Sequence, residues 1–169
     1  MANANLLVPF IKEHEGGFCI VKGDRGGATN IGVTIDTYRH YYGASKTAND
    51  LKNMSSGEWF HIFKAGFWDR WKADNIRNQS VASILVDWLW ASGKWGIIIP
   101  QRILKVKPDG IVGDKTIFAV NAYNQRDLFD YIKTERIAFV HNIVENNPSQ
   151  KKFLQGWVNR INSLKFYES

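Results

Sequence analysis

The sequence predicts an α+β protein that is mostly α-helical, with one small β-hairpin near its N-terminus. Apolar residues recur with helical spacing along most of the chain. Only residues 18–35 combine strand-forming residues with a glycine-rich turn. The chain has 169 residues, of which 44% are hydrophobic, so it is long enough to bury a globular core.

The first helix is expected to begin at Ala4 or Asn5 and to end at Gly16 and Gly17. Glycine suits the left-handed conformation that often follows the last helical residue. Glu15 is therefore expected in the last turn of this helix. The apolar face of the helix consists of Leu6, Leu7, Phe10 and Ile11.

A β-hairpin is expected next, with strands at residues 18–22 and 28–35 joined by a turn at 23–27. Thr34 or Asp36 is expected to cap a helix that runs through Tyr42. A short helix or turn is expected at 50–54.

The remainder of the chain is expected to be helical. Ser55 and Glu58 form a capping box that starts one helix. The segment 80–93 is apolar on almost every side, which is typical of a central, buried helix. Asp87 within it is expected to bond an arginine or a neighbouring helix end rather than to act in catalysis. The last helices are expected at 97–106, 114–123, 127–145 and from residue 149 onward.

The net charge and the cysteine and histidine content indicate which partners and cofactors to expect. The net charge of +6 favours an anionic partner, such as nucleic acid, anionic lipid or a bacterial cell wall. No run of five Lys or Arg residues and no nucleic-acid motif is present, so a nucleic-acid partner is not expected. The single cysteine, Cys19, excludes an intramolecular disulfide. The four histidines are scattered without metal-ligand spacing, so we expect neither a metal nor a cofactor.

The sequence also suggests where the protein is located and whether it inserts into a membrane. The start of the chain lacks a basic region before its apolar stretch, and no run is long enough to span a bilayer. We therefore expect a monomer without stable membrane insertion, cytoplasmic until it is released to the cell wall or periplasm.

In the stretch EHEGGFCIVKGDRGGATNIGVT, residues 13–34, the carboxylates of Glu15 and Asp24 and the hydroxyl of Thr29 lie among two pairs of glycines, which give the backbone conformational freedom. Asp24 follows Glu15 by nine positions and Thr29 follows it by fourteen. A hairpin that folds back on the helix end can bring these groups to one cleft, as cleavage of a glycosidic bond requires. The helix end disfavours the ionised form of Glu15, whereas Asp24 on a wet turn stays ionised. The alternative is that both acids are ordinary surface residues around a turn.

The motif EGGF, followed by Asp24 and GGATNIGVT, resembles the signature of glycoside hydrolase family 108, the N-acetylmuramidases of bacteria and phages. After EGGF this chain carries CIVKG, where family members more often have an Asn-Asp-Pro segment. FWDRWKADNI (67–76) and DWLWASG (87–93) are similar to the later part of the catalytic half. QRIL (101–104), PDGIVGDKTI (108–117) and FLQGWVNRI (153–161) resemble the accompanying peptidoglycan-binding half.

The resemblance implies a lysozyme-like α+β fold, with a catalytic half at 1–93 and a helical peptidoglycan-binding half at 94–169. It implies cleavage of the β-1,4 bond between N-acetylmuramic acid and N-acetylglucosamine, with Glu15 as the general acid. Secondary catalytic roles fall to Asp24 and Thr29. The expected substrate-binding residues are Gly16, Gly17, Gly26, Gly27, Asn30 and Trp68.

Several alternatives remain open at this point. Asn30 also suits a role in holding the hairpin, and the tryptophans, including Trp68, are more often core residues than sugar platforms. The Asp109-Gly110 turn suits a helix–helix corner better than a muropeptide contact. The fold also serves a lytic transglycosylase, or a non-catalytic peptidoglycan-binding protein. Together, the basic charge and the lack of a signal suggest an endolysin of a phage or prophage that lyses bacteria.

Overall fold

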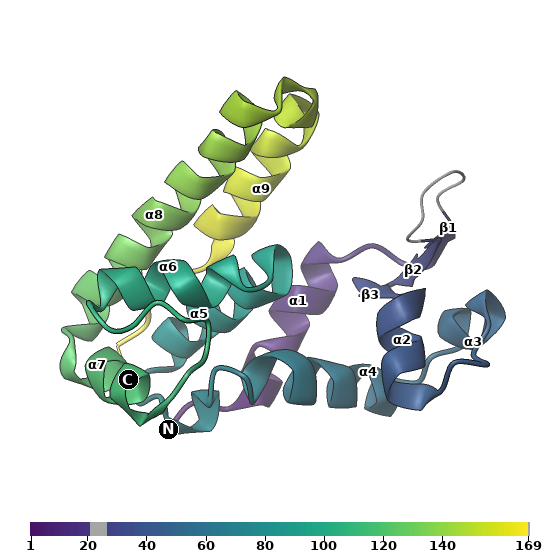
Figure 1. The fold of residues 1–169 in the computed structure, drawn as a ribbon, viewed down its shortest axis with the longest axis horizontal. Helices are drawn as coiled ribbons and strands as arrows, with labels where there is room; N and C mark the ends of the chain where they lie inside the picture. Colours follow the sequence, from purple (N-terminus) through teal and green to yellow (C-terminus); the bar gives the residue numbers. More distant parts are fainter. Residues whose placement is uncertain (21–26, 169) are drawn as a thin grey trace. The chain divides into compact units, whose positions relative to one another are not determined.

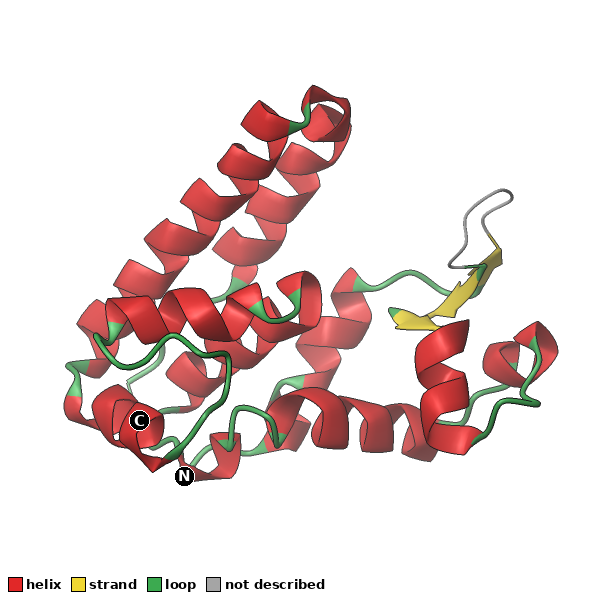
Figure 2. Ribbon diagram, in the orientation of Figure 1, coloured by secondary structure: helices red, strands yellow, loops and turns green. Residues whose placement is uncertain are grey.

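The structure, a computed structural model, describes residues 1–20 and 27–168, and the chain divides into two compact units. The sheet-bearing unit is Ala4–Phe67, and the helical unit combines Met1–Asn3 with Trp68–Ser169. This division at Trp68 differs from the boundary at residue 93 that the sequence suggests. Helices dominate the chain, and the strands are confined to the sheet-bearing unit (Figure 2). The predicted α+β class, mostly helical, is confirmed.

The sheet-bearing unit begins with a 3-10 turn, Ala4–Leu6, and the helix α1, Val8–His14 (Figure 1). Pro9 lies in the first turn of α1, where its missing N–H costs nothing. Leu7 and Ile11 are 1% and 0% exposed, so they anchor this short helix in the core. A helix of seven residues is marginal on its own, and this burial is what holds it.

Three short strands follow in the antiparallel order β1-β2-β3. Their bounds are Cys19–Ile20 for β1, Ala28–Asn30 for β2 and Val33–Thr34 for β3. Thr29 lies opposite Cys19 on one side and Thr34 on the other. The sequence predicts a single strand at 28–35, and most of the predicted turn at 23–27 lies outside the described residues.

A tight turn at Ile31 and Gly32 splits the predicted second strand into β2 and β3. Both residues have positive φ, 47° for Ile31 and 75° for Gly32, as the two central residues of a hairpin turn require. Glycine adopts this conformation freely, but a β-branched residue does so only under strain. Gly32 inside an apolar run was the local signal of this break.

Three helices complete the sheet-bearing unit. They are α2, Ile35–Tyr42, α3, Ala48–Lys52, and α4, Ser56–Phe63. Thr34 caps α2 and Ser55 caps α4 through side-chain oxygens, and Thr47 caps α3 in a full capping box. The capping box predicted for Ser55 and Glu58 is only half formed, because the Glu58 carboxylate accepts from Tyr38 instead of from the Ser55 N–H. A π-helical turn, Lys64–Trp68, follows α4.

Helix α2 is fixed to α4 by a hydrogen bond from the Tyr38 hydroxyl to the Glu58 carboxylate, at 2.6 Å. Burial and the adjacent carboxylate raise the pKa of Tyr38 to about 12. The phenol therefore stays protonated and donates to Glu58 throughout the neutral range.

The helical unit is built around α5, Gln79–Ser92, which Asn78 caps and Gly93 ends. Nine of the ten residues from Ser80 to Leu89 of α5 are buried, on all sides of the helix, which confirms the predicted central helix. The other elements are the 3-10 turn Ala73–Asn75, α6 Trp95–Ile103, α7 Asp114–Ala122, α8 Gln125–Asn146, the 3-10 turn Pro148–Gln150 and α9 Lys151–Ser163. No helix among the described residues is long and apolar enough to cross a membrane.

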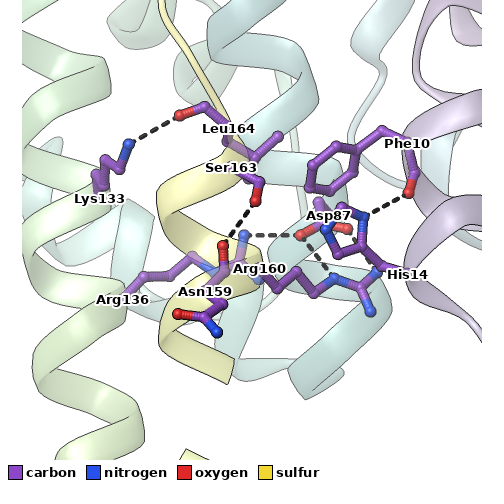
Figure 3. A network of polar contacts seen from close by, with 9 residues as sticks. All are labelled: Phe10, His14, Asp87, Lys133, Arg136, Asn159, Arg160, Ser163 and Leu164. Carbon is purple, nitrogen blue, oxygen red and sulfur yellow. Dashed lines mark hydrogen bonds and ion pairs between the residues drawn. The ribbon is translucent and has the colours of Figure 1, made fainter. Parts of the chain in front are cut away.

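Asp87 joins three helices of this unit. Its carboxylate is fully buried and accepts hydrogen bonds from Arg136 of α8 at 2.9 Å and from Arg160 of α9 at 2.8 Å (Figure 3). Both guanidinium groups converge on this carboxylate from the α8–α9 pair. The expectation that Asp87 bonds an arginine is confirmed, and its role is structural.

The Asp109-Gly110 turn is organised by Gln101 of α6, which is fully buried. The Gln101 amide accepts from the Gly110 N–H at 2.9 Å and donates to the Ile111 carbonyl at 3.0 Å. The Asp109 carboxylate accepts from the Ile111 N–H at 3.0 Å, which helps to hold the pKa of Asp109 below its usual value. The residues of this turn thus bond to one another and to α6, as a helix–helix corner requires.

Candidate active site

Glu15 is the first residue after α1. Its backbone is extended, with φ −102° and ψ 141°, and its side chain is half-buried. The expectation that Glu15 lies in the last turn of a helix beginning at Ala4 or Asn5 is therefore wrong: α1 begins at Val8, after a 3-10 turn, and ends at His14. Gly16 and Gly17 do not adopt the left-handed conformation, because the chain leaves the helix directly in an extended conformation.

The space above Gly16 and Gly17 is open. A Cβ built on either residue meets no atom within 4 Å. Neither glycine is therefore required by a positive φ or by a close contact within the structure. Close approach of a ligand to the backbone is one physical reason for glycine at such a position.

Thr29 lies on the open face of the three-stranded sheet. Its direct neighbours across the strands, Cys19 and Thr34, share that face, because directly opposed residues point the same way. Cys19 is exposed, whereas Ala28 and Asn30 on the opposite face are buried. The hydroxyl of Thr29 is thus carried on the side of the sheet that is not packed on the core.

Two hydrogen bonds at Ile31 fasten the segment after Glu15 to the rest of the unit. The Ile31 N–H donates to the Gly16 carbonyl at 3.0 Å. This bond joins the segment before β1 to the residue that follows β2. The Ile31 carbonyl accepts from the indole N–H of Trp59 at 2.9 Å. The Lys12 ammonium lies over the same indole, 4.8 Å from its ring centroid.

Ile31 and Trp59 are thus site-supporting residues that the sequence analysis missed. Asn30-Ile31-Gly32 carried a turn signal in its glycine, but nothing local predicted a partner on α4, 28 residues later. The segment that carries Glu15 and the strand that carries Thr29 are therefore held together by backbone bonds and by α4.

Asn30 is buried at 7% exposure and anchors the sheet to α3. Its side-chain amide donates to the carbonyl oxygens of Leu51 at 3.0 Å and of Lys52 at 3.4 Å. This geometry favours the structural alternative for Asn30 over a sugar contact. Gly27 has a φ of +60°, so glycine is needed there for the backbone itself.

Trp68 is fully buried, and its indole N–H donates to the Asp74 carboxylate at 2.7 Å. A ring with no exposed face cannot stack on a sugar, so the burial favours the core interpretation of this residue. Asp24 and Gly26, two further predicted site residues, lie outside the described residues. Within residues 1–20 and 27–168, no group of three His, Cys, Asp or Glu side chains is placed to hold a metal ion.

The site therefore offers a half-buried carboxyl group, open backbone beside it and a hydroxyl on the exposed face of an adjoining sheet. A carboxyl group next to an open, hydrogen-bonded backbone can donate a proton to a bulky substrate that lies along the glycines.

Comparison with known proteins gives two family matches and one similar solved structure. The family model described as Glycosyl hydrolase 108 matches residues 8–93, just over half of the chain, and confirms the resemblance. The model described as Predicted Peptidoglycan domain matches residues 95–162. Among solved structures, SagA of Brucella abortus is similar, with a TM-score of 0.81 and 23% identity over 95% of this chain and 90% of that chain. At this identity the likeness concerns the fold. No curated protein matches the chain.

Proposed function

Because the chain belongs to the glycosyl hydrolase 108 family, it is a glycoside hydrolase, and we propose that it cleaves the β-1,4 bond between N-acetylmuramic acid and N-acetylglucosamine. Peptidoglycan is the polymer that contains this bond, and a peptidoglycan-binding domain occupies most of the chain after residue 93.

The observation that carries the proposal is the position of Glu15 beside open glycine backbone. Glu15 follows a helix that is anchored by buried residues, and the next carbonyl is held by the Ile31 N–H. A proton donor needs such a fixed position, because proton transfer depends on distance and alignment to the leaving oxygen. The open space over Gly16 and Gly17 supports a glycan chain running past this group.

In the proposed reaction, Glu15 donates its proton to the glycosidic oxygen as the bond to the anomeric carbon breaks. Positive charge develops on the sugar ring, and a water adds its oxygen to the anomeric carbon while its proton is taken up by a carboxylate. We assign to Asp24 the orientation of this water or the stabilisation of the charged sugar. We assign to Thr29 a hydrogen bond that helps to orient the water.

A lytic transglycosylase and a non-catalytic wall-binding protein are the two competing functions on the same fold. The first would use Glu15 alone and form an anhydro sugar, without adding water. The second would bind the wall and release nothing. Thr29 on the open sheet face and the presence of a second acid, Asp24, favour hydrolysis, because a lyase needs neither to hold a water.

Digestion of purified peptidoglycan with mass analysis of the soluble products tests the proposal. Glu15→Gln should lower the rate about 10²- to 10⁴-fold, the usual contribution of a general acid. Glu13→Gln is the matched control, because Glu13 is an exposed carboxylate two residues earlier, and it should keep full activity.

The products distinguish the three functions. Reducing-end N-acetylmuramic acid from the unsubstituted protein, and little from Glu15→Gln, would support the hydrolase. Products lighter by one water would replace it with a transglycosylase. No products, with protein that still sediments with the wall, would leave a binding protein.

The net charge of +6 suits attraction to an anionic cell wall. We further propose an endolysin-like life cycle, in which the protein waits in the cytoplasm and causes bacteriolysis after release. Lysis that occurs only when a pore-forming protein is co-expressed would support this, and lysis by expression alone would count against it.

A further inference from the structure

A groove lies between α6 and α8 of the helical unit, and its lining includes none of the residues assigned to the reaction. It is a hollow of about 340 Å³, and all of its lining residues fall within the 95–162 match to the peptidoglycan domain. The lining residues that matter here are Ile99, Arg102 and Ile103 from α6, with Tyr131, Glu135 and Phe139 from α8.

The groove lining includes two aromatic rings, those of Tyr131 and Phe139. Tyr131 is 44% exposed, so part of its ring is accessible to a ligand. Phe139 is half-buried and packs edge-on against Trp88 of α5, with ring centroids 5.9 Å apart. Tyr131, Glu135 and Phe139 are spaced by four residues along α8, so they form one continuous stripe.

The groove carries one cation and one anion. Arg102 is exposed and Glu135 is half-buried. Within the described residues, neither side chain makes an ion pair or a hydrogen bond. Elsewhere on α8, by contrast, Arg126 pairs with Asp130 at 2.9 Å. Two opposite charges that line one groove without neutralising each other can each receive a ligand group of the other sign.

We infer that this groove binds the peptide stem of peptidoglycan. The stem carries free carboxylates and, where it is not cross-linked, the primary amine of its diamino residue. Arg102 receives a stem carboxylate and Glu135 receives that amine, while the stem's methyl and methylene groups lie on Tyr131 and Phe139. The inference rests on the proposed function, because it takes peptidoglycan as the substrate.

The charge pattern distinguishes the stem from other partners. The repeating sugars without their peptide carry no cation, so Glu135 would have no partner in them. Nucleic acid is a polyanion, which Glu135 would repel. A zwitterionic peptide of a few residues satisfies both charges and fits a hollow of about 340 Å³.

Isothermal titration calorimetry on the full chain tests the inference, in a Glu15→Gln background so that no probe is consumed. Three probes are used: the disaccharide with its peptide stem and free amine, the same compound with the amine acetylated, and the disaccharide without peptide. Arg102→Gln and Glu135→Gln are the test variants. Arg126→Gln and Glu145→Gln are the matched controls, since each removes the same charge from an exposed position of α8 outside the groove.

Each test variant should bind the free-amine stem roughly tenfold more weakly, as expected for loss of one charge-assisted hydrogen bond. Acetylation should weaken binding by the parent to the same extent and should cause no further loss in Glu135→Gln. The controls should bind as the parent does, and the peptide-free disaccharide, which carries no amine, should show no dependence on Glu135.

Equal affinity of the test variants and the parent for the stem would overturn the inference, as would the absence of stem binding by the parent. Release of reducing ends from whole peptidoglycan by the unsubstituted protein is scored separately. The hydrolase proposal and the stem site can therefore fail independently of each other.

Discussion

The N–H of Ile31 donates to the carbonyl oxygen of Gly16 at 3.0 Å, so the residue after Glu15 is bonded to a strained turn. A β-branched residue with φ of 47° costs about 1–2 kcal/mol relative to its ordinary conformations. The turn persists because both polar backbone groups of Ile31 are satisfied, the carbonyl by the Trp59 indole. Helix α4 therefore supports the segment that carries Glu15, through Trp59 and Ile31.

Trp59→Phe removes the donor to Ile31 and keeps an aromatic ring. We expect a loss of about 1–3 kcal/mol in unfolding free energy, because the carbonyl of the turn loses its partner. The new ring can still stack on Phe63, whose centroid lies 5.4 Å from that of Trp59. The rate of peptidoglycan hydrolysis should fall as well, since the Gly16 segment loses its support.

Chemical denaturation and the hydrolysis assay measure the two effects. Trp95→Phe is the control, because Trp95 is 40% exposed and should tolerate the change. If Trp59→Phe kept both stability and rate, the bond to Ile31 would have no part in holding the site.

Gly17→Ala separates a structural glycine from one that a ligand approaches. The φ of Gly17 is compatible with alanine and a Cβ meets no atom, so stability should rise by about 0.4–1 kcal/mol. Hydrolysis should nevertheless slow, because the methyl group occupies space that the proposed glycan needs. The melting temperature and the hydrolysis rate should therefore move in opposite directions.

Gly27→Ala provides the contrast, since its φ of +60° makes alanine strained and should cost about 1–2 kcal/mol. An unchanged rate for Gly17→Ala would mean that the glycan does not pass over this backbone.

Local patterns in the sequence predicted most of the helices. Ser55 caps α4 and Thr34 caps α2, because a hydroxyl oxygen can accept the free N–H groups of a helix start. The burial of α5 was predictable because residues 80–93 are apolar on almost every side, and a helix of that kind is stable only in the interior of a protein. The split at Ile31 was missed because an isoleucine in an apolar run favours a strand, and tertiary hydrogen bonds overrode that preference.

Local patterns in the sequence also predicted part of the site. Glu15 at a helix end, with glycines after it, followed from local chemistry. The buried contacts of Trp68 and Asn30 depend on partners that spacing alone does not identify. The acidic nature of Asp87 suggested an arginine partner, but its two partners lie 49 and 73 residues further along the chain.

Gly96→Ala should destabilise the helical unit, because α5 and α6 touch at this glycine. A Cβ there would lie 2.4 Å from the backbone nitrogen of Leu89, closer than any real contact allows. Relief requires the helices to separate, at a cost of about 1–3 kcal/mol. Gly156→Ala, on α9, is the matched control: no atom lies near its Cβ, and alanine should stabilise the helix by about 0.5–1 kcal/mol. Thermal unfolding of both variants measures the difference, and equal melting temperatures would contradict the close packing at Gly96.

Asp87→Asn should cost about 3–5 kcal/mol at neutral pH, because it leaves the buried Arg136 guanidinium without a counter-charge. Asp130→Asn, which removes an exposed carboxylate paired with Arg126, should change stability by about 0.5 kcal/mol or less. Urea unfolding of both variants beside the parent gives the comparison.

We also expect the effect of Asp87→Asn on the free energy of unfolding to depend on pH. Burial alone would raise the pKa of Asp87, but Arg136 and Arg160 outweigh burial and hold that pKa below its ordinary value. Above the unfolded-state pKa of about 3.9, the carboxylate is charged in both states and its stabilisation is complete. As the pH falls further, the unfolded chain binds the proton first, so stability is lost progressively until the folded-state pKa is passed. The gap in unfolding free energy between the parent and Asp87→Asn should therefore be constant from about pH 7 to about pH 5 and should narrow below about pH 4. A gap that stayed constant into strong acid would show that Asp87 is not the ionised centre of this network.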